Sequence, residues 1–553
     1  MTTYRLNPYV SFVESRLVPG FVKHAVFHRL TNDIFEPSEK LDVSRDSPEV
    51  RQLIQSGFLI PGDYDPLAPL LDLYVTRPIH NPAVAWHSPS GEWNVVRTSM
   101  EHTVYSRKRD ELAPIVEEQL PPLPAEIFLL ADGSRTLRQI FTAVRGETDD
   151  ANLLQDAEFR EAINFLTTQE RQLIKLTPGR ENLAEPYAYV NIVPRNLYHS
   201  DRKDQPRTDS SSAPIIDFHL HDIEDATWEF DLIEPTINHI FRFPHEALGG
   251  LDYGSRFCIA TLRPEVVPSL KHLSRLDVLE VGGGTGMFAQ SFLKQAAGLN
   301  GTALNYHILD LSPALMTNQR KILSELLPES RHFHQNATEF DLPDHTFDLI
   351  VSNEVIADFP VAAVQRNGER WEGEGAYYVE KYELADQNAP DSFMVNAGAF
   401  RFLERAWKHL NPGGTLIVSE YGAEHTYPLQ CYHLNHEEYS IHFGHLAKCA
   451  TKIGLECRLL PLQEFLHLND AVPVLNGREE HLLCLNHVLK NYGRTLPYTL
   501  ISKADFEKQF AGVVEETGLI GYSFSPLHKQ FHFGPNIKDF LVLIMNKPGE
   551  KEN

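Results

Sequence analysis

Apolar and polar positions in the C-terminal two thirds of the chain repeat with the periods of buried strands and amphipathic helices. The clearest element is Arg275–Gly286, RLDVLEVGGGTG, where an apolar strand ends in an acid and runs into a glycine turn, followed by a helix over Met287–Ala297. Apolar strands that alternate with helices are typical of a mostly parallel α/β sheet covered on both faces. The same pattern predicts strands at Leu304–Asp310, Arg331–Asn336, Phe347–Ser352 and Thr415–Ser419, a helix over Phe400–Leu410, and a last antiparallel strand at Phe540–Met545.

The N-terminal third shows shorter, alternating patterns. Two extended segments between Tyr9 and Glu36 predict one hairpin, and Ala83–Thr98 predicts a second hairpin with its turn at Ser88–Gly91. Three helical patterns and a closing strand follow, at Ala125–Leu130, Thr136–Arg145, Asp156–Leu166 and Gln172–Leu176. Together these elements favour a small α+β domain of the winged-helix type.

A polar stretch without periodicity separates the two parts. Ser200–Ala213 reads SDRKDQPRTDSSSA, which is the composition of a linker. We therefore divide the chain into an N-terminal region over 1–190, a linker over 191–214 and a larger domain over 215–553. In the larger domain we expect a helical cover over 215–270, the α/β core over 271–422 and a C-terminal part with the last strands over 423–553.

Composition and charge restrict the classes of partner. The 553 residues carry a formal charge of −25, and the N-terminal segment from Thr103 to Leu176 holds 9 Lys plus Arg against 13 Asp plus Glu. An acidic winged helix does not suit DNA, so we expect no nucleic-acid partner and favour a cationic or neutral peptide. No apolar run approaches the ~20 residues that span a bilayer, and the N-terminus lacks the apolar block of a signal peptide. The five cysteines form no C-x-x-C pair, so a cytoplasmic protein without membrane contact is expected.

The glycine turn indicates the chemistry. Its spacing, E-x-G-x-G-x-G from Glu280, departs from the dinucleotide pattern and places no basic residue for a pyrophosphate. A carboxylate at the strand end attracts a cation or an amino group, and S-adenosylmethionine carries both and has no phosphate. An ordinary tight β-α connection is the alternative. Asp310, at the end of the next strand, is placed to hold ribose hydroxyls, while the amide of Asn336 could read the adenine edge. The expected cofactor-binding residues are Glu280, Gly282, Gly283, Gly284, Gly286, Asp310, Leu311, Asn336, Ala337 and Asn353.

These segments resemble the MidA-like methyltransferases, a family that includes the mitochondrial complex I assembly factor that methylates arginine. The resemblance is carried by EVGGGTGMFAQSFLK, YHILDLSPALMTNQRKIL, SNEVIADFPV and GGTLIVSEYG, and it covers about residues 235 to 550. It implies a class I Rossmann-like fold with a mostly parallel, seven-stranded sheet, S-adenosyl-L-methionine as cofactor and S-adenosyl-L-homocysteine as product. The chain departs from the family where Ala357 and Asp358 exchange the usual order of Asp and Ala, and where the family's N-terminal signature is missing.

The phrase LADGSRTLRQIF, after a hairpin, resembles the PqqD-like recognition elements of ribosomal-peptide maturation enzymes. Those domains capture a precursor's leader as an added strand at a sheet edge. The resemblance therefore implies a precursor peptide as partner, its leader held by region 1–190 and its core segment in the larger domain. A dimerisation or packing domain without a ligand is the alternative, and the sequence leaves a homodimer open.

Methyl transfer needs an aligned acceptor and a group that takes a proton. Glu354 and Asp358, after the fourth predicted strand, are the expected acceptor-facing acids, with Tyr421 and His442 as further candidates; a capping role is the alternative for Asp358, and packing for Tyr421. The 26 histidines include His442 and His445 at helical spacing, yet no metal motif appears, so no metal is expected.

Three functions remain open at this point. The first, and preferred, is an N-methyltransferase for side-chain nitrogens of a ribosomally made precursor peptide, with Asn or Gln amides favoured over the Arg guanidinium. The second is a MidA-like protein arginine methyltransferase that acts on a folded partner. The third is a catalytically inactive assembly factor.

Overall fold

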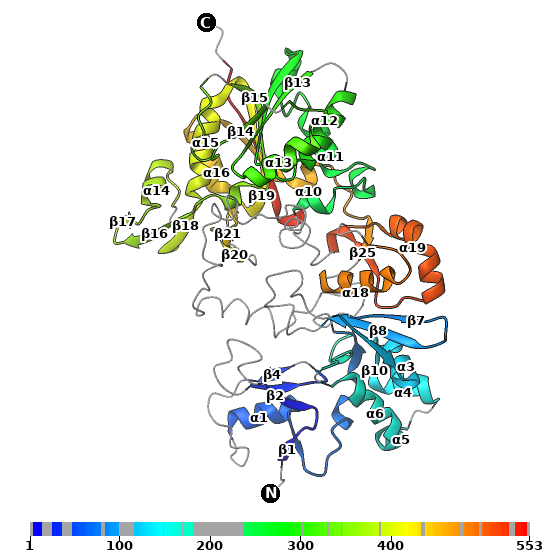
Figure 1. Cartoon of the computed structure of the whole chain (residues 1–553). Helices are drawn as coiled ribbons and strands as arrows, with labels where there is room; N and C mark the ends of the chain where they lie inside the picture. Colours follow the sequence, from blue (N-terminus) through cyan, green and yellow to red (C-terminus); the bar gives the residue numbers. More distant parts are fainter. Residues whose placement is uncertain are drawn as a thin grey trace. The chain divides into compact units, whose positions relative to one another are not determined.

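The computed structural model divides into two compact units, each described by itself (Figure 1). The first comprises Met1–Pro206, Pro473–Pro497 and Lys503–Phe533, and the second Arg207–Val472, Tyr498–Ser502 and Gly534–Asn553. The sequence predicts that all of 423–553 belongs to the larger domain, whereas Pro473–Pro497 and Lys503–Phe533 belong to the first unit. The structure describes residues 4–13, 25–31, 33–35, 47–78, 83–98, 115–146, 149–168, 170–180, 236–299, 303–328, 331–343, 346–385, 389–432, 437–475, 479–496, 500–529 and 537–549; the predicted linker lies outside them.

The second unit is built on a mixed, mostly parallel sheet. Its strands are β12 (Arg275–Val281), β13 (Ala303–Asp310), β14 (His332–His334), β15 (Phe347–Asn353), β19 (Leu410–Ala423), β22 (Ile441–His442), β23 (Glu456–Pro461) and β26 (Phe540–Asn546). The order is β14-β13-β12-β15-β19-β26-β23, with β22 paired to β19, so the sheet has eight strands and not seven. Strands β14 to β19 in this order are parallel, and β26 runs antiparallel to both β19 and β23. The predicted parallel core and antiparallel last strand are confirmed.

Helices pack around this sheet, as Figure 1 shows for α11 and α12 near one side and α15 and α16 near the other. Apolar side chains of the sheet and of α15, such as Ile350, Phe400 and Leu416, are fully buried in one shared core. The helices are α10 (Ile237–Ile240), α11 (Tyr253–Thr261), α12 (Met287–Gly298), α13 (Pro313–Ile322), α14 (Ala376–Tyr382), α15 (Ala397–His409), α16 (Phe443–Lys452) and α17 (Leu462–Phe465), with 3-10 turns η5 (Glu246–Leu248), η6 (Pro268–Lys271), η8 (Ile356–Asp358) and η10 (Ile537–Asp539).

An arm that the sequence did not predict is inserted between β15 and α15. It is a three-stranded antiparallel sheet of β16 (Ala362–Asn367), β17 (Arg370–Glu372) and β18 (Ser392–Val395), with α14 beside it. Gly398, in the first turn of α15, lies so close to Phe359 and Pro360 that a Cβ there would approach them within 2.8 Å. This contact fixes the start of the arm next to the strand ends. A two-stranded ribbon, β20 (Gln430–Tyr432) with β21 (Glu437–Tyr439), follows β19.

The first unit contains several small sheets and helices, which contribute apolar side chains to one shared core. Its sheets are β1 (Tyr4–Leu6) with β5 (Leu59–Pro61); β2 (Val10–Val13), β3 (Ala25–His28) and β4 (Ile34–Phe35); β7 (Ala83–His87), β8 (Trp93–Thr98) and β9 (Ile115–Leu120); β10 (Asp132–Thr136), β6 (Tyr74–Thr76) and β11 (Lys175–Thr177); and β24 (Pro473–Leu475) with β25 (Phe524–Pro526). Its helices are α1 (Pro48–Gln55), α3 (Pro122–Leu130), α4 (Leu137–Arg145), α5 (Asp150–Gln155), α6 (Ala157–Leu166), α18 (Glu479–Lys490) and α19 (Lys503–Thr517), with η1 (Ala68–Leu70) and η9 (Leu527–Lys529).

Several predictions for this unit are confirmed. The hairpin β7–β8 closes with a hydrogen bond from the Gly91 amide to the Ser88 carbonyl at 2.9 Å, and β2 pairs with β3. The three predicted helices are α3, α4 and α6; α4 begins with a capping box between Thr136 and Gln139. The winged-helix class stays a prediction. In the described part of the chain no helix is long and apolar enough to cross a bilayer.

Candidate active site

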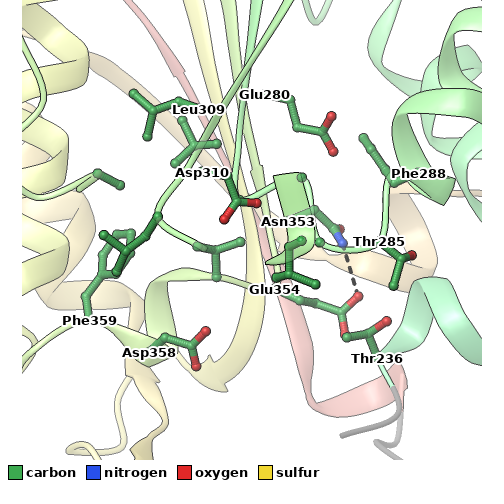
Figure 2. A pocket seen from close by; sticks show the side chains of 18 of the residues that line it. Thr236, Glu280, Thr285, Phe288, Leu309, Asp310, Asn353, Glu354, Asp358 and Phe359 are labelled. Atoms are coloured by element: carbon green, nitrogen blue, oxygen red, sulfur yellow. Dashed lines mark hydrogen bonds between the residues drawn. The ribbon is translucent and has the colours of Figure 1, made fainter. Parts of the chain in front are cut away.

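A pocket lies where four neighbouring parallel strands of the second unit end. In an open α/β sheet this edge is where ligands bind, because the turns after the strands converge there. Figure 2 shows Glu280, Asp310, Asn353 and Glu354 gathered at these strand ends. The lining residues are Thr236, Asn238, His239, Glu280, Val281, Gly282, Gly283, Gly284, Thr285, Met287, Phe288, Leu309, Asp310, Leu311, Leu315, Gln335, Asn336, Ala337, Thr338, Asn353, Glu354, Val355, Asp358, Phe359 and Pro360.

The glycine turn after β12 forms the floor of this pocket. Gly282 has φ +72°, and a Cβ there would lie 2.4 Å from Cγ2 of Val355, so the turn packs directly on the segment after β15. Gly284, at φ +49°, has no atom within 4 Å of its Cβ position, which leaves its side open. Gly286, at φ +86°, caps α12 and is not among the lining residues, so its role is to start the helix.

Glu280 is buried at the end of β12, with 3% of its surface exposed. Its Oε2 accepts a hydrogen bond from the Tyr306 hydroxyl at 3.1 Å. Burial raises the pKa of Glu280 to about 8, and the nearby charge of Asp310 acts in the same direction. A buried carboxyl group with a raised pKa gains a charged partner when a cation binds beside it.

Asp310 is held in place by two hydrogen bonds. Its Oδ1 accepts from the Ser312 amide at 2.9 Å, and its Oδ2 accepts from Nε2 of Gln319 at 2.7 Å. The same Gln319 nitrogen donates to the Gly284 carbonyl at 2.9 Å. Gln319 of α13 therefore ties the acid of β13 to the glycine turn of β12, a role that the sequence did not reveal.

Asn336 follows β14 and lines the pocket. Its Oδ1 accepts hydrogen bonds from the amide and the hydroxyl of Thr338, at 2.9 and 3.0 Å. The side chain is thereby oriented through its oxygen, so its NH₂ group is the part suited to a ligand. Leu311 and Ala337, expected beside the cofactor, also line the pocket.

Asn353 and Glu354 join the end of β15 to the helical cover. The Tyr253 hydroxyl donates to Oδ1 of Asn353 at 2.7 Å, and Nδ2 of Asn353 donates to Oε1 of Glu354 at 3.1 Å, the bond drawn dashed in Figure 2. Glu354 also accepts from the amides of Ile237 and Asn238. Tyr253 is fully buried, and burial raises its pKa well above the usual value.

Asp358 ends the turn η8 and lines the same pocket. Behind this turn lies Glu420 of β19, with 4% of its surface exposed, which sequence analysis missed. Its Oε2 accepts from the Ala357 amide at 3.3 Å and its Oε1 from the Tyr421 amide at 2.8 Å. Burial first, and then the charges of Glu354 and Asp358, raise the pKa of Glu420 well above its usual value.

Two of the expected acceptor-facing residues lie elsewhere. Tyr421 is not among the pocket's lining residues, and its ring packs on Phe540 with centroids 5.9 Å apart. His442 lines a second hollow, where its ring stacks on His445 at 3.6 Å and its Nδ1 accepts from the His445 amide. Tyr421 lies inside β19, which extends to Ala423, and its side chain packs on β26; His442 caps the N-terminus of α16, and its ring stacks on His445 of that helix.

The residues that the sequence missed come from distant segments. Thr236, Asn238 and His239 of the α10 segment line the pocket, and Tyr253 of α11 supports it. Thr236 caps α10 by accepting a hydrogen bond from the His239 amide. A threonine before a short helical pattern is the one sequence signal that could have predicted this helix start.

The charge of the pocket selects its ligand. Four carboxyl groups line it, those of Glu280, Asp310, Glu354 and Asp358, and no Lys or Arg appears among its described lining residues. This suits a ligand with positive charge and no phosphate. Within the described ranges no group of three or more His, Cys, Asp and Glu side chains is arranged to hold a metal ion.

A protein-family model matches the part of the chain that supplies most of this pocket. Residues 258–401 match the model of a family described as "Putative S-adenosyl-L-methionine-dependent methyltransferase". The matched segment contains the glycine turn, Asp310, Asn336 and the Asn353–Asp358 segment. A search of curated proteins found no match. S-adenosyl-L-methionine is accordingly the cofactor of this chain.

Several solved structures match part of the chain. A superfamily member from Burkholderia thailandensis bound to S-adenosyl-homocysteine is 16% identical, with 62% of this chain and 94% of that chain covered and a TM-score of 0.33. A methyltransferase from Clostridium acetobutylicum is 12% identical over 38% of this chain and 85% of that chain, with a TM-score of 0.26. The glycopeptide N-methyltransferase MtfA is 15% identical over 38% and 84%, with a TM-score of 0.24. At these values the likenesses say nothing about the acceptor of this chain.

Proposed function

We propose that this S-adenosyl-L-methionine-dependent methyltransferase methylates side-chain nitrogens of a ribosomally made precursor peptide, with Asn or Gln amides favoured and the Arg guanidinium as a further acceptor. The observation that carries the proposal is the pocket itself, with four carboxyl groups and no Lys or Arg among its described lining residues. A sulfonium cofactor and a nitrogen acceptor that must lose a proton both suit such a site.

The cofactor's groups can be assigned to residues of the pocket. Glu280 suits the α-amino group, Asp310 the ribose hydroxyls, and the amide of Asn336 the adenine edge, with Leu311 and Ala337 as apolar contacts. When bound, the cofactor supplies a methyl group on a positively charged sulfur. The open side of the glycine turn leaves room for close approach of the ligand to the backbone.

The acceptor belongs at the Asp358 end of the pocket. A side-chain amide is a poor nucleophile, so a carboxylate that orients its NH₂ group and accepts a proton assists the in-line displacement. We assign this role to Asp358, which lines the pocket together with Asn353 and Glu354. A side-chain amide can donate to a single carboxylate, whereas a guanidinium is usually held by bidentate pairing.

The first unit is the proposed holder of the precursor's leader. Strand β9 is the last strand in the order β7-β8-β9, so it offers an edge to which a peptide can add as a fourth strand. A hollow lined by Trp93, Gln119, Leu120 and Pro121, among others, lies at the end of this strand. We propose the cytoplasm as the setting of this reaction. Its reducing conditions suit the free thiols of the described cysteines, which are Cys258, Cys449, Cys457 and Cys484.

A second candidate is a MidA-like arginine methyltransferase that acts on a folded protein. The observation that favours it is the grouping of acids, since Glu420 lies behind Glu354 and Asp358, and paired carboxylates are the usual partners of a guanidinium. The third possibility, an inactive assembly factor, is disfavoured because the glycine turn, Glu280 and Asp310 are all assembled in one pocket.

The proposal requires that a short precursor peptide is encoded beside the gene for this chain; the test is an assay of that peptide with S-adenosyl-L-methionine, read by mass spectrometry, and the lack of such a gene would count against the proposal. We expect +14 shifts on Asn or Gln side chains, and few or none on a peptide without its leader. Asp358→Asn should lose most of the activity, whereas Glu369→Gln, at an exposed position of the arm, should keep it. Shifts confined to Arg of a folded protein would favour the second candidate, and no shift on either substrate class would overturn both.

A further inference from the structure

The helix α10 begins against the pocket, and its first amides are bound by a residue far away in the sequence. The amide of Ile237 donates to Oε2 of Glu354 at 2.7 Å, and the amide of Asn238 donates to Oε1 at 3.3 Å. The next amide, that of His239, donates to the Thr236 hydroxyl at 3.0 Å. The amides that open every helix lack partners within it, and here Glu354 satisfies two of them from 117 and 116 residues away.

Glu354 is itself held firmly for this contact. Its backbone has φ +55°, a left-handed conformation that is uncommon outside glycine, and its amide donates to the Ser419 carbonyl at 2.8 Å. Its Oε1 also accepts from Nδ2 of Asn353, whose own Oδ1 is bound by the Tyr253 hydroxyl. Strain of this kind persists where the surrounding structure fixes the side chain for a purpose.

We infer that Glu354 is a positioning residue that clamps the segment Thr236–Ile240 onto the cofactor pocket and thereby controls how tightly the cofactor is enclosed. Three residues of the segment, Thr236, Asn238 and His239, line the pocket, so release of the two amides would free one wall. The inference rests on the proposed function in one respect, that S-adenosyl-L-methionine occupies this pocket.

The clamp differs from a proton-accepting role in what it predicts. A general base must offer its carboxylate to the acceptor, whereas both Glu354 oxygens already accept amide hydrogens. Loss of a base would slow methyl transfer and leave cofactor binding unchanged. Loss of the clamp would speed cofactor release even when no acceptor is present.

The variants are Glu354→Gln and Glu354→Ala, with Glu369→Gln, at an exposed position of the arm outside the pocket, as the control. A glutamine keeps the length but offers only one accepting oxygen, so it should retain one of the two amide bonds. The full chain is titrated with S-adenosyl-L-homocysteine, and its release is followed by stopped flow. Hydrogen–deuterium exchange of residues 236–242 is measured with and without the ligand.

We expect release from Glu354→Ala to be about ten- to a hundredfold faster, from the strength of hydrogen bonds to a charged group, and that from Glu354→Gln to be intermediate. Exchange at 236–242 should rise in both variants, while exchange in β12 stays at the level of the wild type. Glu369→Gln should bind and exchange like the wild type. If Glu354→Ala does not fold, the glutamine variant alone decides.

Wild-type release and wild-type exchange in Glu354→Gln would overturn the clamp. A loss of methyl transfer in that variant with unchanged ligand affinity would overturn it too and return Glu354 to the acceptor's chemistry. Failure of the wild type to bind either S-adenosyl-L-methionine or its product would instead defeat the proposed function, and the exchange measurement would still judge the contact between Glu354 and α10.

Discussion

Glu280 shows how one buried carboxyl group links pH to cofactor binding. Its pKa is raised from 4.5 to about 8, with burial as the main cause. Between those values the unliganded folded protein keeps a proton on Glu280 that the unfolded chain has lost, so this group makes stability fall as the pH rises through that window. A cationic amino group stabilises the ionised form, so ligand binding should expel the proton.

We therefore predict proton release when S-adenosyl-L-homocysteine binds near pH 7. Calorimetric titrations in buffers of different ionisation enthalpy should give a net release that approaches one proton, and affinity should rise with pH toward about 8. Glu280→Gln should abolish the release and weaken binding, because a neutral amide attracts the ammonium less. Equal proton release in the variant and the wild type would assign the effect to another group.

Among single residues, the sequence predicted those whose place in the site follows from their position at the end of a strand. Glu280, Asp310 and Asn353 end neighbouring strands, and a parallel sheet brings such ends together. Gln319, Tyr253 and Glu420 were missed because their contacts join residues 35, 100 and 63 positions apart, and no local pattern records them. Tyr421 and His442 were predicted to face the acceptor, but neither lines the pocket, because the direction of a side chain depends on its packing.

At the scale of elements, the turn η8 depends on Glu420. This carboxyl group accepts the amides of Ala357 and Tyr421 in a buried setting. We predict that Glu420→Ala leaves these donors without partners and lowers the free energy of unfolding by about 1–3 kcal/mol, measured by denaturant titration. Because the pKa of Glu420 is raised, stability should fall with increasing pH in the wild type, and Glu420→Gln should reduce this slope. An unchanged slope would show that Glu420 does not titrate in this way.

The glycine turn allows a matched pair of substitutions. In Gly282→Ala the new Cβ would lie 2.4 Å from Val355, and φ is +72°, so a clear drop in the melting temperature is expected. In Gly284→Ala nothing lies within 4 Å, and the cost is the left-handed backbone alone, about 1–2 kcal/mol. Gly284→Ala should nevertheless weaken S-adenosyl-L-homocysteine, because its methyl group enters the open side of the turn. Thermal melts and titrations of the two variants check this, and equal melting temperatures would contradict it.

Most elements of the α/β core were predicted to within a few residues, since buried strands carry long apolar runs. Strand β19 is longer than predicted, at Leu410–Ala423, because it continues through the Asn-Pro-Gly-Gly segment that was interpreted as a helix end. The arm of β16, β17 and β18 was missed, as its strands have three to six residues and only one partly buried face. Short strands of this kind depend on their pairing more than on their own pattern.

At the scale of the whole molecule, the chain order does not match the two units. Residues 473–497 and 503–533 belong to the first unit, although the second unit's last strand, β26, follows them. Helix α18 packs on β7 and β8 with Leu485, Val488 and Leu489 fully buried, and Ile520 forms a bridge with Ala85. No sequence pattern predicts that these late segments pack in the first unit, because their position depends on tertiary contacts between distant apolar surfaces.

The same packing makes the first unit dependent on its C-terminal segments. We predict that a fragment of residues 1–206 exposes the apolar face of β7 and β8 that α18 covers, and that it aggregates or binds a hydrophobic dye. A fragment of 1–206 joined by a flexible linker to 473–533 should be monomeric and give a cooperative thermal transition, because Leu485, Val488 and Leu489 again cover that face. The control is the joined fragment with Leu485→Asp, which buries a charge at the contact and should behave like the shorter fragment. A cooperative melt from 1–206 alone would show that the first unit is complete without the later segments.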